Sequence, residues 1–255
     1  MSYTAIAFIL ATVVFDQEPK SGATRVNDKG IELVYVPSGS FTMGSDMNRT
    51  EQPVRKVTLT GFWIGKNDVT VEQFRKFTEA ANYTFFWAAF KPTWGWVDDN
   101  PMVNVTWEDA RAYCKWAGGD LPTEAQWEKA ARGTDGRQYP WGKDFDAHYA
   151  WWSKDGTAAS AGSTASVGRF PKGASPYGCL DMSGNVWQWC LDWFSEDGYD
   201  AEDLKDPLGA PGGKGRAVRG GAWVINNPLM LRSSHRIGQL PTVRRHGVGF
   251  RLVSK

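Results

Sequence analysis

Cysteines are the most reactive side chains in this 255-residue chain, which contains three of them. They are Cys114, Cys179 and Cys190. No two have the close CxxC spacing of zinc ribbons or thioredoxin-like redox sites, and three thiols cannot all pair in disulfides. We therefore expect each to be a small buried hydrophobic residue rather than a reactive thiol.

Histidines offer no clearer catalytic or metal site. They are His148, His235 and His246, and they lack an H-x-x-x-H or similar spacing, which disfavours non-haem iron. The chain also lacks a G-x-S-x-G nucleophile elbow, a phosphate-binding P-loop and a dinucleotide fingerprint. These residues do not indicate an enzyme, and we expect no catalytic residues, metal or cofactor.

The charge balance excludes a further class of partner. Lys and Arg number 29 against 28 Asp and Glu, which gives a formal net charge of +1. A chain with so little net charge and no block of like charges has no field to attract nucleic acid. Its length is enough for a sizeable core. We expect one domain and a monomer.

The N-terminal segment 1–29 is expected to be an extension. Its apolar run, residues 5–15, is shorter than the roughly 20 residues that span a bilayer, so we expect no transmembrane segment. It lacks the basic residues and cleavage site of a secretory signal, so we expect an ordered segment rich in β-branched residues. A trimmed export signal would leave the compartment open, with the cell surface or an extracytoplasmic location favoured.

Three helices are predicted by capping boxes, in which a Thr hydroxyl and a side chain three residues later satisfy free amides of the first turn. They begin at Thr70, Thr106 and Thr123, with Gln73, Asp109 and Gln126 as the returning side chains. Apolar residues follow at helical spacing, which predicts helices of about 10–15 residues.

Short β-favouring runs separated by turn residues surround these helices. They lie at 31–45, 54–66, 216–223 and 247–253. After residue 132 the helical periodicity ends and Gly, Pro, Ser, Asp and Trp dominate, so 14 tryptophans are available to hold irregular segments by packing and by indole N–H bonds. The pattern predicts a loop-rich α+β domain with short helices and small antiparallel sheets.

Seven motifs occur in order along residues 30–253. They are GSFTMGS (39–45), FWIGKNDVTVEQFRKF (62–77), the segment 100–133, YPWG (139–142), YGCLDMSGNVWQWCLDW (177–193), RAVRGGAW (216–223) and GVGFRLV (247–253). Together they resemble the formylglycine-generating-enzyme, or sulfatase-modifying-factor, domain. The resemblance implies a C-type-lectin-like fold over residues 30–255.

The enzymes of that family imply chemistry that this chain does not support. The founding enzyme oxidises a substrate cysteine with copper and two cysteines just beyond the RGGS(W/Y) strand, but the matching stretch 224–236 contains none. A related branch, the sulfoxide synthases, adds a helical bundle with iron-binding histidines for which this chain has no room. We therefore expect a non-catalytic domain.

The family also carries structural calcium. The resemblance would place one ion at Asp181 and Gln188, with backbone carbonyls near Gly184 and Val186. Gln188 stands where the family has Glu, which weakens the site. The alternative is that Asp181 and Asn185 hydrogen-bond to loop backbone.

The segment between Trp223 and Gly249 is the expected site of function. It resembles the variable proteins of diversity-generating retroelements, which vary residues between RGGSW and GFR, and this gives a variable ligand-binding region at 218–252. The expected ligand-binding residues are Trp223, Val224, Ile225, Asn226, Leu229, His235, Ile237, Leu240, Val243, Arg245, His246 and Gly247. We expect Arg219, Arg232, Arg236 and Arg251 to bind loop carbonyls instead.

The leading hypothesis is a receptor-like protein that displays these residues to a protein or cell-surface ligand. Two alternatives remain open at this point. One is a formylglycine-generating-enzyme-related oxidoreductase with another reaction in the same cavity. The other is an accessory domain, acting on protein substrates or within a larger signalling or secretion assembly, because the family is often attached to kinases and transporters.

Overall fold

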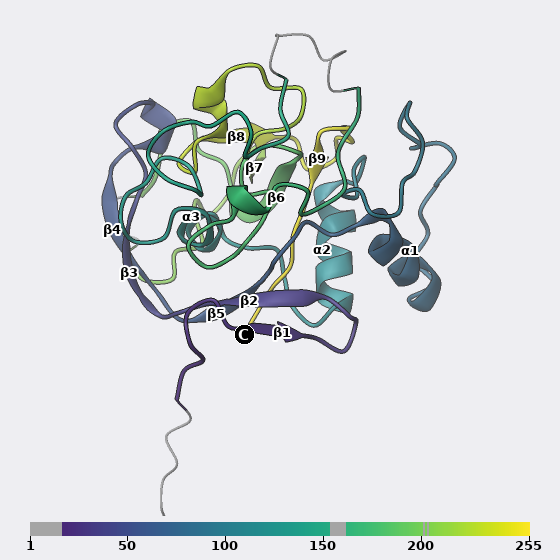
Figure 1. Cartoon of the computed structure of the whole chain (residues 1–255), viewed down its shortest axis with the longest axis horizontal. Helices are drawn as coiled ribbons and strands as arrows, with labels where there is room; N and C mark the ends of the chain where they lie inside the picture. Colours follow the sequence, from purple (N-terminus) through teal and green to yellow (C-terminus); the bar gives the residue numbers. More distant parts are fainter. Residues whose placement is uncertain (1–16, 154–161, 201, 203) are drawn as a thin grey trace, which may run out of the picture.

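The computed structural model describes residues 17–153, 162–200, 202 and 204–255. One antiparallel sheet contains four short strands in the order β1-β2-β5-β10, near the C-terminus at the bottom of Figure 1. Their bounds are β1 Thr24–Val26, β2 Glu32–Val36, β5 Phe62–Gly65 and β10 Val253–Ser254. The sheet therefore begins within the segment that the sequence assigns to the N-terminal extension, while residues 5–15 lie outside the described part of the chain.

A second sheet has the order β8-β7-β6-β9 and lies in the upper half of Figure 1. Its strands are β6 Trp187–Trp193, β7 Arg216–Arg219, β8 Arg236–Gln239 and β9 Val248–Gly249. The β6–β9 pair is parallel, and the other two pairs are antiparallel. A separate ribbon pairs β3 Gly39–Met43 with β4 Arg55–Leu59.

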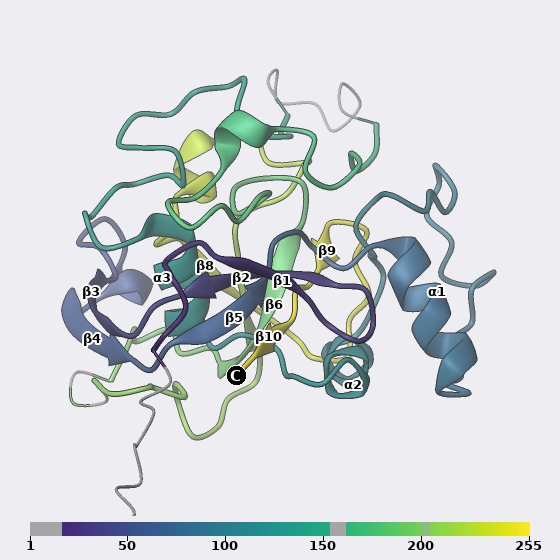
Figure 2. The same ribbon diagram turned by 60° about the horizontal axis from the view of Figure 1, so that its bottom comes forward.

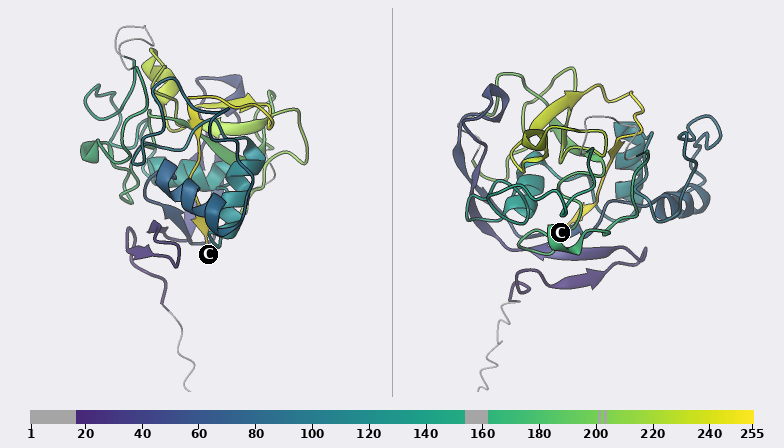
Figure 3. Two further views of the ribbon diagram at one scale, coloured as in Figure 1. Left: turned by 90° about the vertical axis from the view of Figure 1, so that its right-hand side faces the viewer. Right: turned by 45° about the horizontal axis from the view of Figure 1, so that its top comes forward.

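The three predicted helices form where their capping boxes stand. They are α1 Val71–Ala80, α2 Trp107–Trp116 and α3 Glu124–Arg132, and each has both reciprocal cap bonds. Helices α1 and α2 lie together at one side of the molecule (Figures 1 and 3), whereas α3 packs between the β3–β4 ribbon and the second sheet.

Short 3₁₀ turns and loops fill the rest of the described chain, as predicted for the half after residue 132. The turns are η1 Arg49–Glu51, η2 Pro171–Gly173 and η3 Pro228–Leu231. The expected strand 216–223 ends at Arg219, because Gly220 and Gly221 take positive φ values of 94° and 76° that leave the strand conformation. The expected strand 247–253 divides into β9 and β10.

Buried aromatic rings hold these loops to the sheets (Figure 2 shows the layers from a second side). Trp107, Trp127 and Trp189 are among the largest fully buried side chains. The indole N–H of Trp107 donates to the carbonyl of Cys190, and that of Trp189 donates to the carbonyl of Val105. Within the described residues, no helix is both long and apolar enough to cross a membrane.

Candidate functional site

The predicted ligand-binding residues differ widely in exposure. The side chains of five are exposed: Asn226, Leu229, Leu240, Arg245 and His246. Five are half-buried, namely Val224, Ile225, His235, Ile237 and Val243, and all of these except His235 pack on the hydrophobic core beneath. Trp223 and Gly247 are buried. The exposed five can meet a ligand without rearrangement of the core.

One group of these residues lines a groove of about 870 Å³ beside strand β8. His235, Ile237 and Leu240 belong to it, and its other lining residues include the η1 turn and Phe194. The structure thus brings three predicted residues together around a concave surface of the size that binds ligands.

A second group is an aromatic cluster. The rings of Trp223 and His246 lie 5.5 Å apart, and Trp94 packs against both at 5.4 and 6.0 Å. The indole N–H of Trp223 donates to the carbonyl of His246 at 3.3 Å. Trp94 was not predicted for the site. The sequence feature that could have indicated a role for Trp94 is the aromatic-rich stretch 83–96. This stretch has neither a helix-capping pattern nor a strand pattern.

Trp187 lies between the two groups. Its ring is 5.8 Å from the imidazole of His235, and its backbone N–H donates to the carbonyl of Gly247 at 2.8 Å. This buried residue of β6 therefore joins the groove and the aromatic cluster into one region of the molecule.

Behind the groove, Arg232 binds Glu51 through two parallel hydrogen bonds. The Nη1–Oε2 distance is 2.9 Å and the Nη2–Oε1 distance is 2.8 Å. Both side chains are buried. Arg232 also donates to the Oγ of Ser234 and to the carbonyl of Leu229, so one guanidinium holds both ends of the segment that enters β8.

His235 shares this carboxylate. Its Nδ1 lies 3.3 Å from Oε1 of Glu51, while its Nε2 is buried without a hydrogen-bond partner in the described part of the chain. Burial alone would raise the pKa of Glu51. Hydrogen bonds from His235, Arg232, Ser45 and Asn48 outweigh it and hold that pKa far below its usual range. Glu51 is therefore a fixed, buried negative charge behind His235, which lines the groove.

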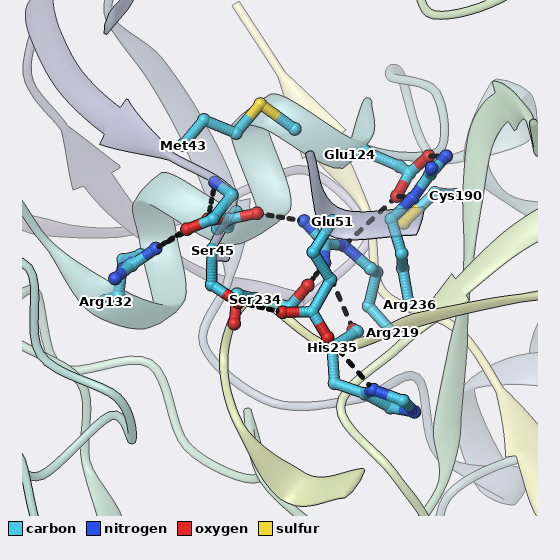
Figure 4. Close-up of polar contacts among 12 residues, drawn as sticks. Met43, Ser45, Glu51, Glu124, Arg132, Cys190, Arg219, Ser234, His235 and Arg236 are labelled. Carbon is cyan, nitrogen blue, oxygen red and sulfur yellow. Dashed lines mark hydrogen bonds and ion pairs between the residues drawn. The ribbon is translucent and has the colours of Figure 1, made fainter. Parts of the chain in front are cut away.

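Two further arginines are held by carboxylates of helix α3 (Figure 4). Arg236 donates to both carboxylate oxygens of Glu124, with an Nε–Oε2 distance of 2.7 Å. Arg219 binds the carboxylate of Glu128 and donates to the carbonyls of Ser234 and His235. The prediction that these arginines are structural ties is confirmed.

Arg251 is the fourth structural arginine, and it meets the loop that the resemblance assigns to calcium. Its guanidinium donates to Gln188 Oε1 at 2.6 Å and to the carbonyls of Gly65 and Leu180 at 2.8 Å. Trp127 gives Gln188 Oε1 a second donor, at 2.6 Å. The oxygen that would face a cation is thus already bonded twice.

The rest of the donor set does not fit calcium either. The Nε2 group of Gln188 donates to the carbonyl of Asp181 at 2.8 Å, so the side chain that would supply a calcium ligand is committed to the protein at both its oxygen and its nitrogen. The side chain of Asp181 accepts from Gly168 N–H, and that of Asn185 bonds both backbone groups of Ala165. Such hydrogen bonds to loop backbone are the alternative to calcium binding that the sequence leaves open.

None of the three thiols is exposed on the predicted face. Cys114, Cys179 and Cys190 are all fully buried and free. Burial raises the pKa of each, well above its usual value for Cys114 and Cys190. The expectation of buried, unreactive thiols is supported by this geometry, because neutral thiols inside a core are poor nucleophiles and poor metal ligands.

Comparison with known proteins identifies the family to which this architecture belongs. Residues 19–255 match the model of the "Sulfatase-modifying factor enzyme 1-like domain". A serine/threonine-protein kinase, Pkn1 of Chlamydia trachomatis, is 35% identical over 86% of this chain, but the match spans only 38% of the kinase. The formylglycine-generating enzyme of Streptomyces coelicolor is 30% identical, with 92% of each chain covered. An inactive Cα-formylglycine-generating enzyme 2 of Bos taurus is 29% identical, with 89% of each covered.

Solved structures give the same fold. PvdO of Pseudomonas aeruginosa superposes with a TM-score of 0.79 at 26% identity, covering 92% of this chain and 99% of that one. Variable protein 1 of Treponema denticola superposes with a TM-score of 0.70 at 23% identity, covering 91% and 98%. The fold is the loop-rich, C-type-lectin-like α+β architecture, and the chain belongs to the formylglycine-generating-enzyme, or sulfatase-modifying-factor, family.

Proposed function

We propose that this domain is a non-catalytic binding module that presents residues 224–247 to a protein or cell-surface ligand. The observation that carries the proposal is that the segment contains both buried, ion-paired residues and fully exposed ones. Arg232 and Arg236 are buried in ion pairs, whereas Asn226 and Leu229 before them and Leu240 after them are exposed. Exposed apolar and polar side chains on a well-anchored backbone suit a recognition surface.

The absence of thiols from residues 224–236 supports a role without oxidation. Family members include enzymes and an inactive relative, so both a catalytic and a non-catalytic role are compatible with the family. In this chain, a half-buried Ile225 and Met230 lie in the stretch that would hold the cysteine pair. Aliphatic and thioether side chains there cannot supply two thiolates.

The test compares this domain with a formylglycine-generating enzyme under the same conditions. Both proteins are loaded with copper and given a cysteine-containing peptide, and oxygen uptake is measured. We expect uptake by the enzyme and none above buffer by this domain. Stoichiometric copper binding with oxygen consumption would instead establish the oxidoreductase alternative.

A second candidate function is an accessory domain within a larger protein, favoured by the match to 38% of a protein kinase. In that role the same face would bind a substrate or a neighbouring domain of the assembly. Genomic neighbours distinguish the two roles. A reverse transcriptase gene and an imperfect downstream copy of the DNA encoding residues 218–252 belong to the variable-protein role alone.

A further inference from the structure

The chain contains three copies of the pattern N-x-T. They are NRT (48–50), NYT (82–84) and NVT (104–106). The middle residue is never proline, so each copy fits the acceptor motif for N-linked glycosylation. None of the three asparagines belongs to the proposed binding segment 224–247. A motif of three residues is too short to identify a site alone, so the structure around each copy has to distinguish them.

The glycosylation reaction sets what such a site must provide. The carboxamide nitrogen of the asparagine forms a bond to C1 of the first sugar of an oligosaccharide carried on a polyprenyl pyrophosphate. The bond from C1 to the pyrophosphate oxygen breaks, the lipid pyrophosphate leaves with the electron pair, and the nitrogen loses one proton. A folded protein must therefore present a free carboxamide and the Thr side chain of the motif on its surface.

The copy at 104–106 does not meet this requirement. The Nδ2 group of Asn104 donates to the carbonyl of Phe90 at 2.8 Å. Oγ1 of Thr106 accepts from the backbone N–H of Asp109 at 3.1 Å as part of the capping box of α2. Val105, between them, is 0% exposed. Both side chains of the motif are therefore committed, and releasing them would disrupt the start of α2.

The copy at 48–50 is also held by the fold. The side chain of Asn48 is exposed, but its Nδ2 group donates to Oε1 of Glu51 at 2.8 Å. Glu51 is buried and ion-paired with Arg232. Thr50 is half-buried, and its carbonyl accepts from Arg236 at 2.8 Å. The nitrogen that would attack the sugar is thus bonded to a buried carboxylate.

The copy at 82–84 presents both of its motif side chains. Asn82 and Thr84 are exposed, and neither side chain has a hydrogen-bond partner in the described part of the chain. Tyr83, between them, faces inward. Its ring lies 4.8 Å from that of Phe77, and its Oη donates to Oδ1 of Asp109 at 2.8 Å. The tyrosine therefore anchors this copy while its two neighbours remain free.

The backbone of Asn82 is fixed without help from its side chain. Helix α1 ends at Ala80, and Asn82 takes a φ of 50°, the left-handed conformation that asparagine tolerates after a helix end. The N–H of Tyr83 donates to the carbonyl of Thr78 at 2.9 Å, and that of Asn82 donates to the carbonyl of Glu79 at 3.4 Å. This pair of bonds is a Schellman ending, which satisfies the helix and leaves the carboxamide free.

We infer that Asn82 is an acceptor site for N-linked glycosylation, and that the folded protein excludes Asn48 and Asn104 from the same reaction. The substrate class is a polyprenyl-pyrophosphate-linked oligosaccharide, which an oligosaccharyltransferase supplies. The site follows helix α1, on the opposite side of the molecule from the β3–β4 ribbon (Figures 1 and 2). This inference is independent of the proposed binding function.

The test compares the folded chain with short unfolded peptides as acceptors. It uses a single-subunit oligosaccharyltransferase chosen because it modifies synthetic peptides that span each of the three copies. The purified full chain is incubated with this enzyme and its lipid-linked oligosaccharide under native conditions. Modified asparagines are then identified by mass spectrometry after enzymatic removal of the glycan in heavy-oxygen water, which converts each modified asparagine to a labelled aspartate.

In the folded chain, we expect modification of Asn82 to exceed that of Asn48 or Asn104 by about tenfold or more, because the latter two react only after local unfolding. The peptides provide the reference, since they show how well the enzyme uses each sequence without a fold. The preference for Asn82 should therefore disappear when each rate is compared among the peptides.

Two variants test whether Asn82 reacts through its own motif. Thr84→Ala removes the motif hydroxyl at an exposed position and keeps Asn82, so it should abolish the modification. Thr84→Ser is the matched control, because it keeps a hydroxyl and should retain the modification. Melting curves followed by circular dichroism check that both variants fold like the unmodified protein.

An unmodified Asn82 in the folded chain would overturn the inference, and so would equal modification of the three asparagines. Modification that persists in Thr84→Ala would also overturn it, because the motif would then not be the reason for the reaction. None of these results bears on the binding function, which is tested separately by oxygen uptake.

Discussion

Arg232 and Glu51 are 181 residues apart in the chain, yet they form a bidentate, fully buried ion pair. The pair connects the η1 turn to the segment that enters β8. It lies directly beneath His235, which shares the carboxylate and lines the groove. A binding surface whose exposed residues vary needs a backbone held by contacts that do not involve those residues. The buried pair of Arg232 and Glu51 is a contact of this kind.

The first prediction concerns the stability of this ion pair. Arg232→Met leaves Glu51 buried without its main partner and should lower the free energy of unfolding by about 3–5 kcal/mol. The double variant Glu51→Leu with Arg232→Met removes both charges and should recover much of that loss. Urea unfolding measures both.

Asp197→Asn is the matched control, because it breaks the exposed ion pair of Arg49 with Asp197. Its effect should be about 0–1 kcal/mol. If Arg232→Met were no more destabilising than this control, the buried pair would not be a major support of the segment.

The second prediction concerns acid stability. The pKa of Glu51 is lower in the folded protein than in the unfolded chain, where it is near 4.5. As the pH falls below about 4.5, the unfolded chain takes up a proton that the folded protein does not, so this contribution to stability is lost. The free energy of unfolding, measured in urea between pH 7 and pH 3, should fall less steeply in Glu51→Gln than in the unmodified protein. Parallel curves would show that Glu51 is not held ionised.

The third prediction concerns the calcium loop. Because the amide of Gln188 bonds the carbonyl of Asp181, a chelator should leave the melting temperature of the protein unchanged. Gln188→Glu replaces that N–H group by a carboxylate oxygen and should be destabilised without calcium and stabilised by adding it. Differential scanning calorimetry with EDTA or calcium checks both proteins. A melting temperature of the unmodified protein that falls in EDTA would show that calcium is a native component.

The fourth prediction concerns which displayed positions tolerate change. Substitutions at Asn226, Leu229 and Arg245 should alter the free energy of unfolding by about 0.5 kcal/mol or less, because these side chains are exposed. Trp223→Ala removes a 4% exposed indole and should cost about 3–5 kcal/mol. Thermal or urea unfolding of the four variants measures this. Equal costs at all four positions would mean that exposure does not decide tolerance.

Local patterns made much of this fold predictable. The capping boxes at Thr70, Thr106 and Thr123 are complete within four residues, so the sequence alone locates all three helix starts. The family motifs supplied the loop-rich architecture that no periodicity encodes. The structural role of Arg219 was expected because one guanidinium can bind several loop carbonyls.

Long-range pairings could not be predicted in this way. No local pattern links Glu51 to Arg232, and none places Trp94 against Trp223, because both contacts depend on loops without regular hydrogen bonding. The same limit explains why Trp223 is buried although its position suggested the edge of the displayed face. Exposure is decided by the loops that cover a residue, and sequence spacing does not report it.

Sequencing the gene in several isolates tests the central claim most directly. If residues 224–247 form a replaceable binding surface, differences should cluster at the codons of exposed positions such as Asn226, Leu240 and His246. The variable proteins that this segment resembles vary their residues through randomised asparagine codons, so the changes should be of the kind such codons permit. They should spare the codons of Arg232 and Arg236. Differences spread evenly along the chain, or changes at those arginines as frequent as at the exposed positions, would contradict the account.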